Sequence, residues 1–142
     1  MFAAKLLAPL AVLASAVSAQ QDNGHWTLSQ LNVTVSPSHT TISFYVDDTN
    51  KPGQFRCWNE IYGGEDYWFP CLYDHDDVHF ATDLNLTEIY MGRRIDDVQA
   101  GTVTRTNGSA PLGLECKGTL GGEDCHHAGE LVVPVTQKTM VA

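Results

Sequence analysis

The sequence predicts an all-β protein, a single compact antiparallel β-barrel or sandwich of about 8–11 short strands with two local disulfides. The segment 40–46 alternates polar and apolar residues, with Ile42, Phe44 and Val46 on one face. This two-residue period is typical of a strand that buries one of its faces. Similar short runs recur along the chain between clusters of Gly, Pro, Asn and Asp, and the four cysteines fall into two closely spaced pairs.

The remaining strands are predicted from short runs of β-branched, aromatic or aliphatic residues. They are expected at residues 26–28, 31–35, 54–58, 67–72, 78–80, 84–91, 98–105, 112–116 and 131–136. Turns are expected at 36–38, 47–53, Gly63-Gly64, Asn107-Gly108 and Gly121-Gly122. Residues 84–94 could instead form a short helix capped by Asn85 and Glu88. Gly92 would interrupt that helix, so a strand is favoured.

The N-terminus has the pattern of a secretory signal peptide. Lys5 precedes an apolar run at 6–17, which closes on Ala19 in the small-x-small pattern that signal peptidase cleaves. Residues 1–19 are therefore predicted to be removed, leaving one secreted, extracellular β domain over residues 20–142. The apolar run is too short for a stop-transfer helix, so we expect no membrane insertion. Residues 137–142 are expected to form a flexible tail.

The charge of the chain excludes two classes of partner. The formal net charge is −9, and removal of Lys5 with the signal peptide makes the mature chain more negative still. Such a chain repels phosphate backbones, so we expect no nucleic-acid partner. It also lacks the cluster of basic residues that would hold it to an anionic membrane.

Three N-x-[ST] sequons follow the predicted signal peptide, at Asn32, Asn85 and Asn107. In a chain that enters the secretory pathway, these asparagines are candidate glycosylation sites and are therefore expected at the surface. The protein is predicted to be a eukaryotic secreted glycoprotein.

The four cysteines are expected to form disulfides, because their number is even and the predicted compartment is oxidising. Three pairings are possible. Cys57–Cys71 and Cys116–Cys125 are favoured, because each pair is local and brackets two adjacent glycines suited to a turn. Neither pair has the short spacing of a zinc knuckle, so a structural role is favoured over metal binding.

A series of short motifs carries a resemblance to a known family. In chain order these are W-x-[aliphatic]-S at 26–29, the strand TISFYV at 41–46, F-x-C at 55–57, [WY]-x-x-C at 68–71, V-x-F at 78–80, and a second cysteine pair before a terminal valine-rich strand. This order resembles the family of the major Alternaria allergen, small secreted fungal proteins that include elicitors of plant cell death. The likeness extends over nearly all of the mature chain.

The resemblance implies a compact β-barrel with two intradomain disulfides and no established enzymatic activity. We expect no cofactor. Members of that family are associated with host recognition, and some bind plant defence proteins or small aromatic compounds. The allergen dimerises through an additional cysteine near its mature N-terminus, but residues 20–40 contain none here. We therefore expect a monomer or a non-covalent dimer.

A metal site is conceivable in the sequence DHDDVH at 74–79. On a strand, His75, Asp77 and His79 would share one face, which is an arrangement that a metal ion could use. The alternative is an acidic turn that runs into a strand whose other face carries Val78 and Phe80. We favour this alternative and expect no metal.

Catalysis is not expected. The chain contains no G-x-S-x-G elbow, and four disulfide-bonded cysteines leave no catalytic thiol. A small ribonuclease would need an acid, a base and a cation at the phosphate, and His79, Glu88 and Arg93 or Arg94 could be assigned to these roles. Many β-rich proteins with six histidines would allow such a selection, so the assignment carries little weight.

The segment between Cys57 and Cys71 is the strongest candidate for binding. It holds Trp58, Tyr62, Tyr67 and Trp68 together with three acidic residues, and a stapled loop of this size cannot bury every ring. Exposed Trp and Tyr favour contacts with proteins and with planar ligands, although Trp68 and Phe69 could pack beneath the disulfide. Together with the family resemblance, this segment predicts an effector-like or elicitor-like protein that binds a host extracellular protein. The alternatives are a carrier of a small aromatic ligand and an unrecognised hydrolase.

Overall fold

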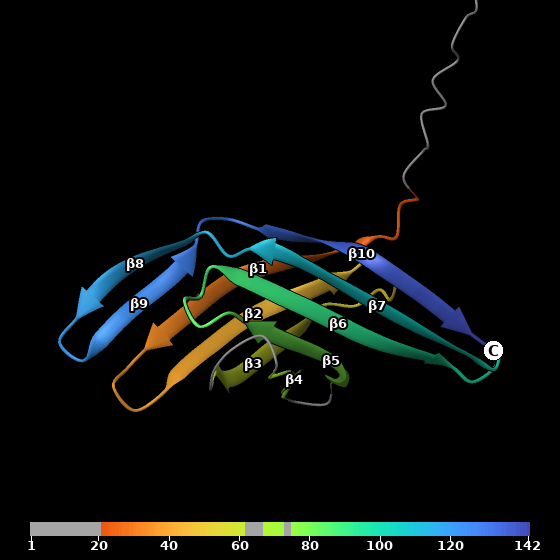
Figure 1. Cartoon of the computed structure of the whole chain (residues 1–142), viewed down its shortest axis with the longest axis horizontal. Helices are drawn as coiled ribbons and strands as arrows, with labels where there is room; N and C mark the ends of the chain where they lie inside the picture. The colour runs from red at the N-terminus through yellow and green to blue at the C-terminus, as the bar shows by residue number, and fades with distance from the viewer. Residues whose placement is uncertain (1–20, 62–66, 73–74) are drawn as a thin grey trace, which may run out of the picture.

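The computed structural model of the protein describes residues 21–61, 67–72 and 75–142. These residues form ten strands and no helix (Figure 1), so none of them belongs to a helix that could cross a membrane. The strands are β1 (His25–Val35), β2 (Thr40–Asp48), β3 (Phe55–Ile61), β4 (Phe69–Cys71), β5 (His75–Thr82), β6 (Glu88–Asp97), β7 (Thr102–Pro111), β8 (Leu114–Thr119), β9 (Gly122–His127) and β10 (Leu131–Val141). The all-β prediction is confirmed. The predicted signal peptide lies outside the described residues.

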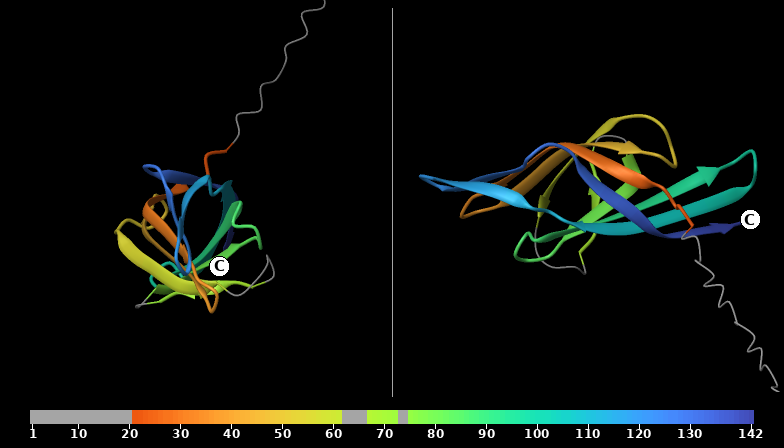
Figure 2. Two further views of the ribbon diagram at one scale, coloured as in Figure 1. Left: turned by 90° about the vertical axis from the view of Figure 1, so that its left-hand side faces the viewer. Right: turned by 90° about the horizontal axis from the view of Figure 1, so that it is seen from above.

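All strand pairs are antiparallel and form one strongly curved sheet. The order along this sheet is β3-β2-β1-β10-β7-β6-β5-β4, with the β8–β9 hairpin attached to β1 through β9. Seen end-on, the strands curve around a common axis and bring β3 and β4 toward each other (Figure 2). The result is a nearly closed barrel whose seam lies between β3 and β4.

The barrel is filled by side chains from alternate positions of the strands. In β2, Ile42, Phe44 and Val46 are buried as their alternation predicts. The ring of Phe44 meets the ring of Phe80 on β5 edge to face, with centroids 5.5 Å apart, and Trp26 on β1 is fully buried. Burial of such side chains stabilises the fold by about 1.5–3 kcal/mol each.

Both predicted disulfides are present, Cys57–Cys71 and Cys116–Cys125. Cys57–Cys71 joins β3 to β4 across the barrel seam, where the described residues form no strand ladder. Two further hydrogen bonds cross this seam: Asn59 Nδ2 donates to the Pro70 carbonyl at 2.8 Å, and Leu72 N donates to the Trp58 carbonyl at 3.4 Å. Closure of the barrel therefore relies on this disulfide rather than on strand pairing.

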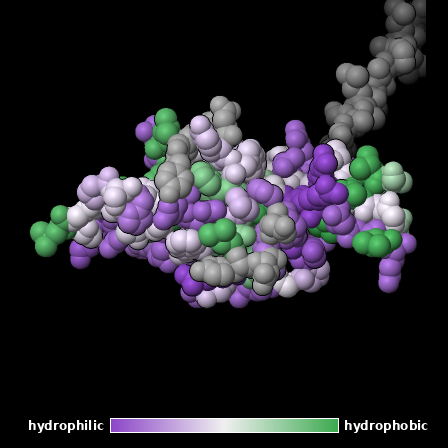
Figure 3. All heavy atoms as spheres, turned by 90° about the horizontal axis from the view of Figure 1, so that it is seen from below, coloured by the Kyte–Doolittle hydropathy of each residue, from purple (hydrophilic) through white to green (hydrophobic). Residues whose placement is uncertain are grey.

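A bulge in β1 divides the sheet into two wings. Gln30 has a φ of 50°, and the pairing with β2 shifts between Ser29 and Asn32. Before the bulge β1 pairs with β10, and after it β1 pairs with β9. The β8–β9 hairpin and the β6–β7–β10 end consequently extend in opposite directions (Figures 1 and 2). Apolar side chains reach the surface at both ends (Figure 3), among them Leu120 and Val98.

The predicted turn at Asn107-Gly108 is wrong, because β7 passes straight through these residues. Gly108 is required there by close packing, since a Cβ would lie 1.9 Å from the Pro134 carbonyl oxygen. The chain turns instead between β6 and β7, where Asp97 Oδ1 accepts hydrogen bonds from the amides of Gln99 and Ala100 at 3.1 and 3.0 Å. The strand predicted at 98–105 is therefore displaced toward the C-terminus.

The predicted flexible tail at 137–142 is also wrong over most of its length. Strand β10 continues to Val141, and Gln137 to Val141 pair with Asn107 to Val103 of β7. The side chains of these residues are exposed, so no burial pattern indicates the strand in the sequence. Strand β9 is not among the predicted strands. Its sequence GEDCHH is almost entirely polar, so it too has no alternation of apolar residues that would indicate a strand.

We expect loss of the Cys57–Cys71 disulfide to destabilise the protein by about 3 kcal/mol or more, from the loop entropy and from closure of the barrel. The double variant Cys57→Ser, Cys71→Ser should show this loss in urea unfolding. The matched control is Cys116→Ser, Cys125→Ser, whose disulfide joins directly opposite residues of a hairpin that is already paired at six positions. An equal or larger loss in this control would contradict the assigned role of the seam.

Candidate functional site on the outer face of β4 to β7

A pocket of about 230 Å³ lies on the outer face of the barrel, beside the seam. Its lining residues come from β5, β6, β7 and the residue just before β4. They are Trp68, Asp77, His79, Gly92, Arg93, Arg94, Arg105 and Asn107. The pocket is smaller than the 300–1,000 Å³ or so of usual ligand sites, so it suits a small molecule or one group of a larger partner.

Strand alternation places His79, Gly92, Arg94, Arg105 and Asn107 on the outer face, whereas Arg93 has the inward position of Met91. Val78, Met91 and Thr106 point inward and are buried, so their neighbours on β5, β6 and β7 point outward. The ladders align His79 with Gly92 and Gly92 with Asn107, and they align Arg94 with Arg105 one step along. Two rows of side chains thus form the floor of the pocket.

Trp68 forms one wall of the pocket. Its indole lies over Gly92, because a Cβ on Gly92 would be 3.4 Å from Trp68 Cζ3 and 2.9 Å from Asn107 Oδ1. The glycine therefore leaves the space that the indole occupies. Trp68 is still 45% exposed and Tyr67 beside it is 61% exposed, so both rings are accessible to a partner.

The pocket concentrates positive charge in an acidic protein. Three of the four arginines of the chain line it. Arg94 and Arg105 stand directly opposite each other on β6 and β7, an arrangement of like charges that costs the sheet stability. Arg94 pairs with Asp96 at 2.9 Å, whereas Arg105 forms no ion pair with any residue that the structure describes. This uncompensated charge favours an anion.

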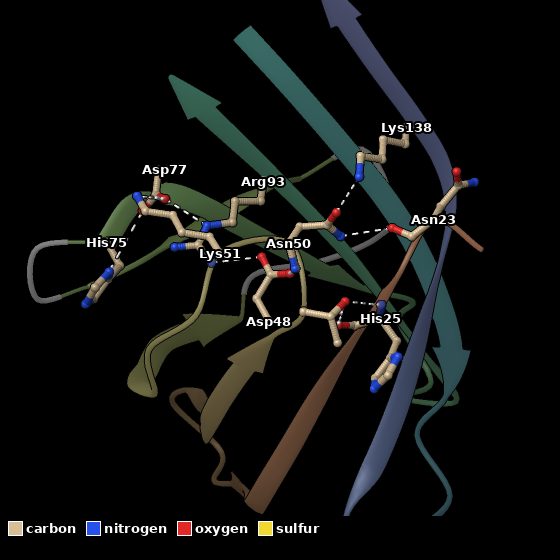
Figure 4. A network of polar contacts seen from close by, with 10 residues as sticks. Asn23, His25, Asp48, Asn50, Lys51, His75, Asp77, Arg93 and Lys138 are labelled. Atoms are coloured by element: carbon tan, nitrogen blue, oxygen red, sulfur yellow. Dashed lines mark hydrogen bonds and ion pairs between the residues drawn. The ribbon is translucent and has the colours of Figure 1, made fainter. Parts of the chain in front are cut away.

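Arg93 is buried and has a structural role. Its guanidinium donates to Asp48 Oδ2 and to Asp77 Oδ2, each at 2.8 Å, and Lys51 Nζ lies 3.5 Å from the same Asp77 oxygen (Figure 4). The side chains of Arg93 and Asp48 are 3% and 0% exposed. This network ties the end of β2 to β5 and β6 across the barrel. It thereby supports the pocket from below.

The residues considered for metal binding do not form a common site. The ring of His75 stacks on Phe55 with centroids 4.1 Å apart, and its Nδ1 is 3.9 Å from Asp77 Oδ1. The Asp77 carboxylate is held by Arg93 and Lys51, while His79 lines the pocket. Their ligand atoms do not converge within 4.8 Å. In the described part of the chain only Cys116, Glu123 and Cys125 do so, and both sulfurs are in a disulfide.

The residues considered for hydrolysis are only partly brought together. His79 and Arg94 both line the pocket. Glu88, however, lies at the other end of β6, opposite Pro111. Gly92 is four positions further along the strand, which corresponds to about 13 Å. The pocket therefore lacks the acid–base pair that a ribonuclease mechanism needs.

The structure separates the predicted binding residues. Trp68 lines the pocket, and Tyr67, its neighbour in the chain, is exposed. Trp58 is half-buried on β3, and neither Trp58 nor Tyr67 lines the pocket. Tyr62 lies outside the described residues. The sequon asparagines Asn32, Asn85 and Asn107 are all exposed. Asn107 lines the pocket, so a glycan on it would occupy the same space as a ligand.

Sequence reasoning missed Arg105 and Gly92 as site residues, because it named no turn between the strands expected at 84–91 and 98–105 and ended the second strand before a turn at Asn107-Gly108. The usable signal is Asp97 followed by Gly101, a pair suited to a short turn. Folding the chain back there aligns Arg94 with Arg105 and Gly92 with Asn107, as the ladder shows.

Comparisons with known proteins bear on the fold. No family model matches the chain, and no curated protein sequence matches it. Two crystal structures of the Alternaria alternata major allergen Alt a 1 do match, each with a TM-score of 0.61. They are 13% and 11% identical to this chain, covering 87% and 86% of it and 95% and 98% of the allergen chains.

This chain has the Alt a 1 fold. The resemblance expected from the motif order is thus confirmed in the fold of nearly the whole described domain. Sequence identity at this level does not carry the allergen's properties to this chain. Strands β5, β6 and β7 supply every lining residue of the pocket except Trp68, which directly precedes β4.

The carboxyl of Asp77, which lines the pocket, makes the stability of the folded protein depend on pH. Burial alone would raise its pKa, but the hydrogen bond and charge of Arg93 and the charge of Lys51 outweigh burial and hold the pKa below its ordinary value. A carboxyl whose pKa is lowered by folding stabilises the protein above its unfolded pKa of about 3.9. That contribution is lost as the pH falls through the lower, folded pKa.

Asp77→Asn should therefore lower the free energy of unfolding at neutral pH by about 1.5 kcal/mol, the lower end for a hydrogen bond to a charged group, because Asp77 is partly exposed. Below about pH 4 the difference from wild type should shrink. Urea unfolding across pH measures both effects. Asp96→Asn is the control, since its surface ion pair should contribute at most about 1 kcal/mol. A deficit independent of pH would contradict this assignment.

Proposed function

We propose that the protein acts outside the cell as a non-enzymatic, effector-like or elicitor-like binding protein that recognises a host extracellular component. The observation that carries the proposal is the exposed pair Tyr67 and Trp68, held beside an arginine-lined pocket by the Cys57–Cys71 disulfide. Exposed aromatic rings with few rotamers to immobilise supply much of the binding energy of recognition surfaces.

Export is part of this proposal. It rests on the signal-peptide pattern at 1–19 and on the two disulfides, since disulfides persist mainly in oxidising compartments. The fold shared with the allergen Alt a 1 is compatible with an extracellular role. An acidic surface with a local basic pocket also favours a selective partner over a general polyanion.

Absence of catalysis is part of the same proposal. The structural neighbours are allergens, and the pocket holds His79 and arginines without Glu88 or another free carboxylate. The pocket itself favours a second candidate function, that of a carrier for a small aromatic ligand. Both functions would use Trp68.

A double variant tests the proposed surface. Tyr67→Ala, Trp68→Ala should lose most recovery of a specific protein from plant extracellular fluid, because loss of two interface aromatics costs about 2 kcal/mol or more each at a hot spot. The control is Val98→Ala, which changes an exposed apolar residue in the turn between β6 and β7. Recovery of bound proteins is compared by quantitative mass spectrometry.

Equal recovery of the same proteins by wild type and by the double variant would remove this surface from the account. If no protein is recovered but native mass spectrometry of the secreted protein shows a bound small molecule, the carrier function replaces the proposed one.

A further inference from the structure

We infer that the pocket at Trp68 binds a planar aromatic group that carries a negative charge, such as an aromatic carboxylate. The inference rests on the proposed binding function and specifies the chemistry that this surface recognises. Three features of the pocket support it: an uncompensated arginine, a fixed indole face and a small volume.

The first feature is the charge of Arg105. The side chain is exposed at the pocket, and no described acidic residue pairs with it. Asp77, the one acidic residue of the lining, is engaged by Arg93 and Lys51, and Asp96 is engaged by Arg94. A guanidinium stays protonated and presents two parallel N–H donors that match a carboxylate. An incoming anion therefore meets unused donors at Arg105.

The second feature is the orientation of Trp68. Its indole is packed over the backbone of Gly92, next to the Asn107 amide, so little conformational freedom remains to be lost on binding. A half-exposed indole attracts flat rings through offset stacking. Within one pocket, Trp68 can therefore contact the aromatic ring of a ligand, and Arg105 can contact its anionic group.

The third feature is size. A pocket of about 230 Å³ holds one or two fused rings but not a protein loop. Polyanions such as nucleic acids are disfavoured because the chain as a whole carries a net charge of −9. A larger depression of about 480 Å³ lies beneath the β8–β9 hairpin, but its lining includes no cation and no aromatic ring. The anionic ligand is thus specific to the pocket at Trp68.

Three probes distinguish the contribution of the aromatic ring to binding from that of the negative charge. Naphthoate has both ring and charge, naphthylmethanol has the ring alone, and cyclohexanecarboxylate has the charge alone. Binding is measured by titration of amide signals in two-dimensional NMR at low salt. The protein is prepared with its disulfides intact and without N-glycans, because Asn107 lines the pocket. Naphthoate should shift the signals of Gly92 and Asn107 and bind about tenfold or more tightly than either other probe.

Substitutions in the pocket test which residue binds the charge and which binds the ring. Arg105→Gln should weaken naphthoate binding about tenfold, the effect of one charge-assisted hydrogen bond, and leave binding of naphthylmethanol unchanged. Trp68→Ala should weaken binding of both aromatic probes, and Trp68→Phe should restore most of it. Arg56→Gln is the matched control, because Arg56 is the one arginine that does not line the pocket; it should behave as wild type.

Several outcomes would overturn the inference. These are no binding of naphthoate by wild type, equal affinity for naphthoate and naphthylmethanol, or equal weakening by Arg105→Gln and Arg56→Gln. If naphthoate fails while a host protein is still recovered in a manner that depends on Tyr67 and Trp68, the ligand chemistry is wrong and the proposed recognition surface stands. If naphthoate binds as expected and no host protein is recovered, the ligand chemistry stands and the proposed recognition of a host protein is wrong.

Discussion

The disulfide between Cys57 and Cys71 is the constraint on which the remaining structure depends. Most neighbouring strands of the barrel are joined by a ladder of backbone hydrogen bonds, but among the described residues β3 and β4 are joined by this bond and two hydrogen bonds. Strand β4 is only three residues long, too short to hold its position by pairing alone. The disulfide therefore fixes the segment that carries Trp68.

A second constraint acts beneath the same surface. Arg93 is buried with carboxylates on either side, one from β2 and one from β5. Burial of such charges gains little net stability, but removal of one partner is costly. The network therefore acts mainly through position, because it locks the ends of strands that come from opposite sides of the barrel. The disulfide and this ion network hold the two sides of the pocket in one arrangement.

The sequence was sufficient for the features that depend on burial and local spacing. Alternation revealed β2 and its core face, and cysteine spacing revealed both disulfides. It was insufficient where a strand is held by backbone pairing alone, as in β9 and the end of β10. The pocket depends on strand register, which the misplaced turn at Asn107 obscured. The turn predicted at 47–53 includes Asp48, although this residue continues the inward positions of Phe44 and Val46 in β2.

The contact between Trp68 and Gly92 tests this account most directly. Nuclear Overhauser effects from the Trp68 indole protons to the Gly92 α-protons should be present in the oxidised protein. In Cys57→Ser, Cys71→Ser they should disappear, while the cross-strand effects between Gly92 and Asn107 persist. If the indole contact survives loss of the bridge unchanged, something other than the sulfur linkage positions the tryptophan, and the central claim is wrong.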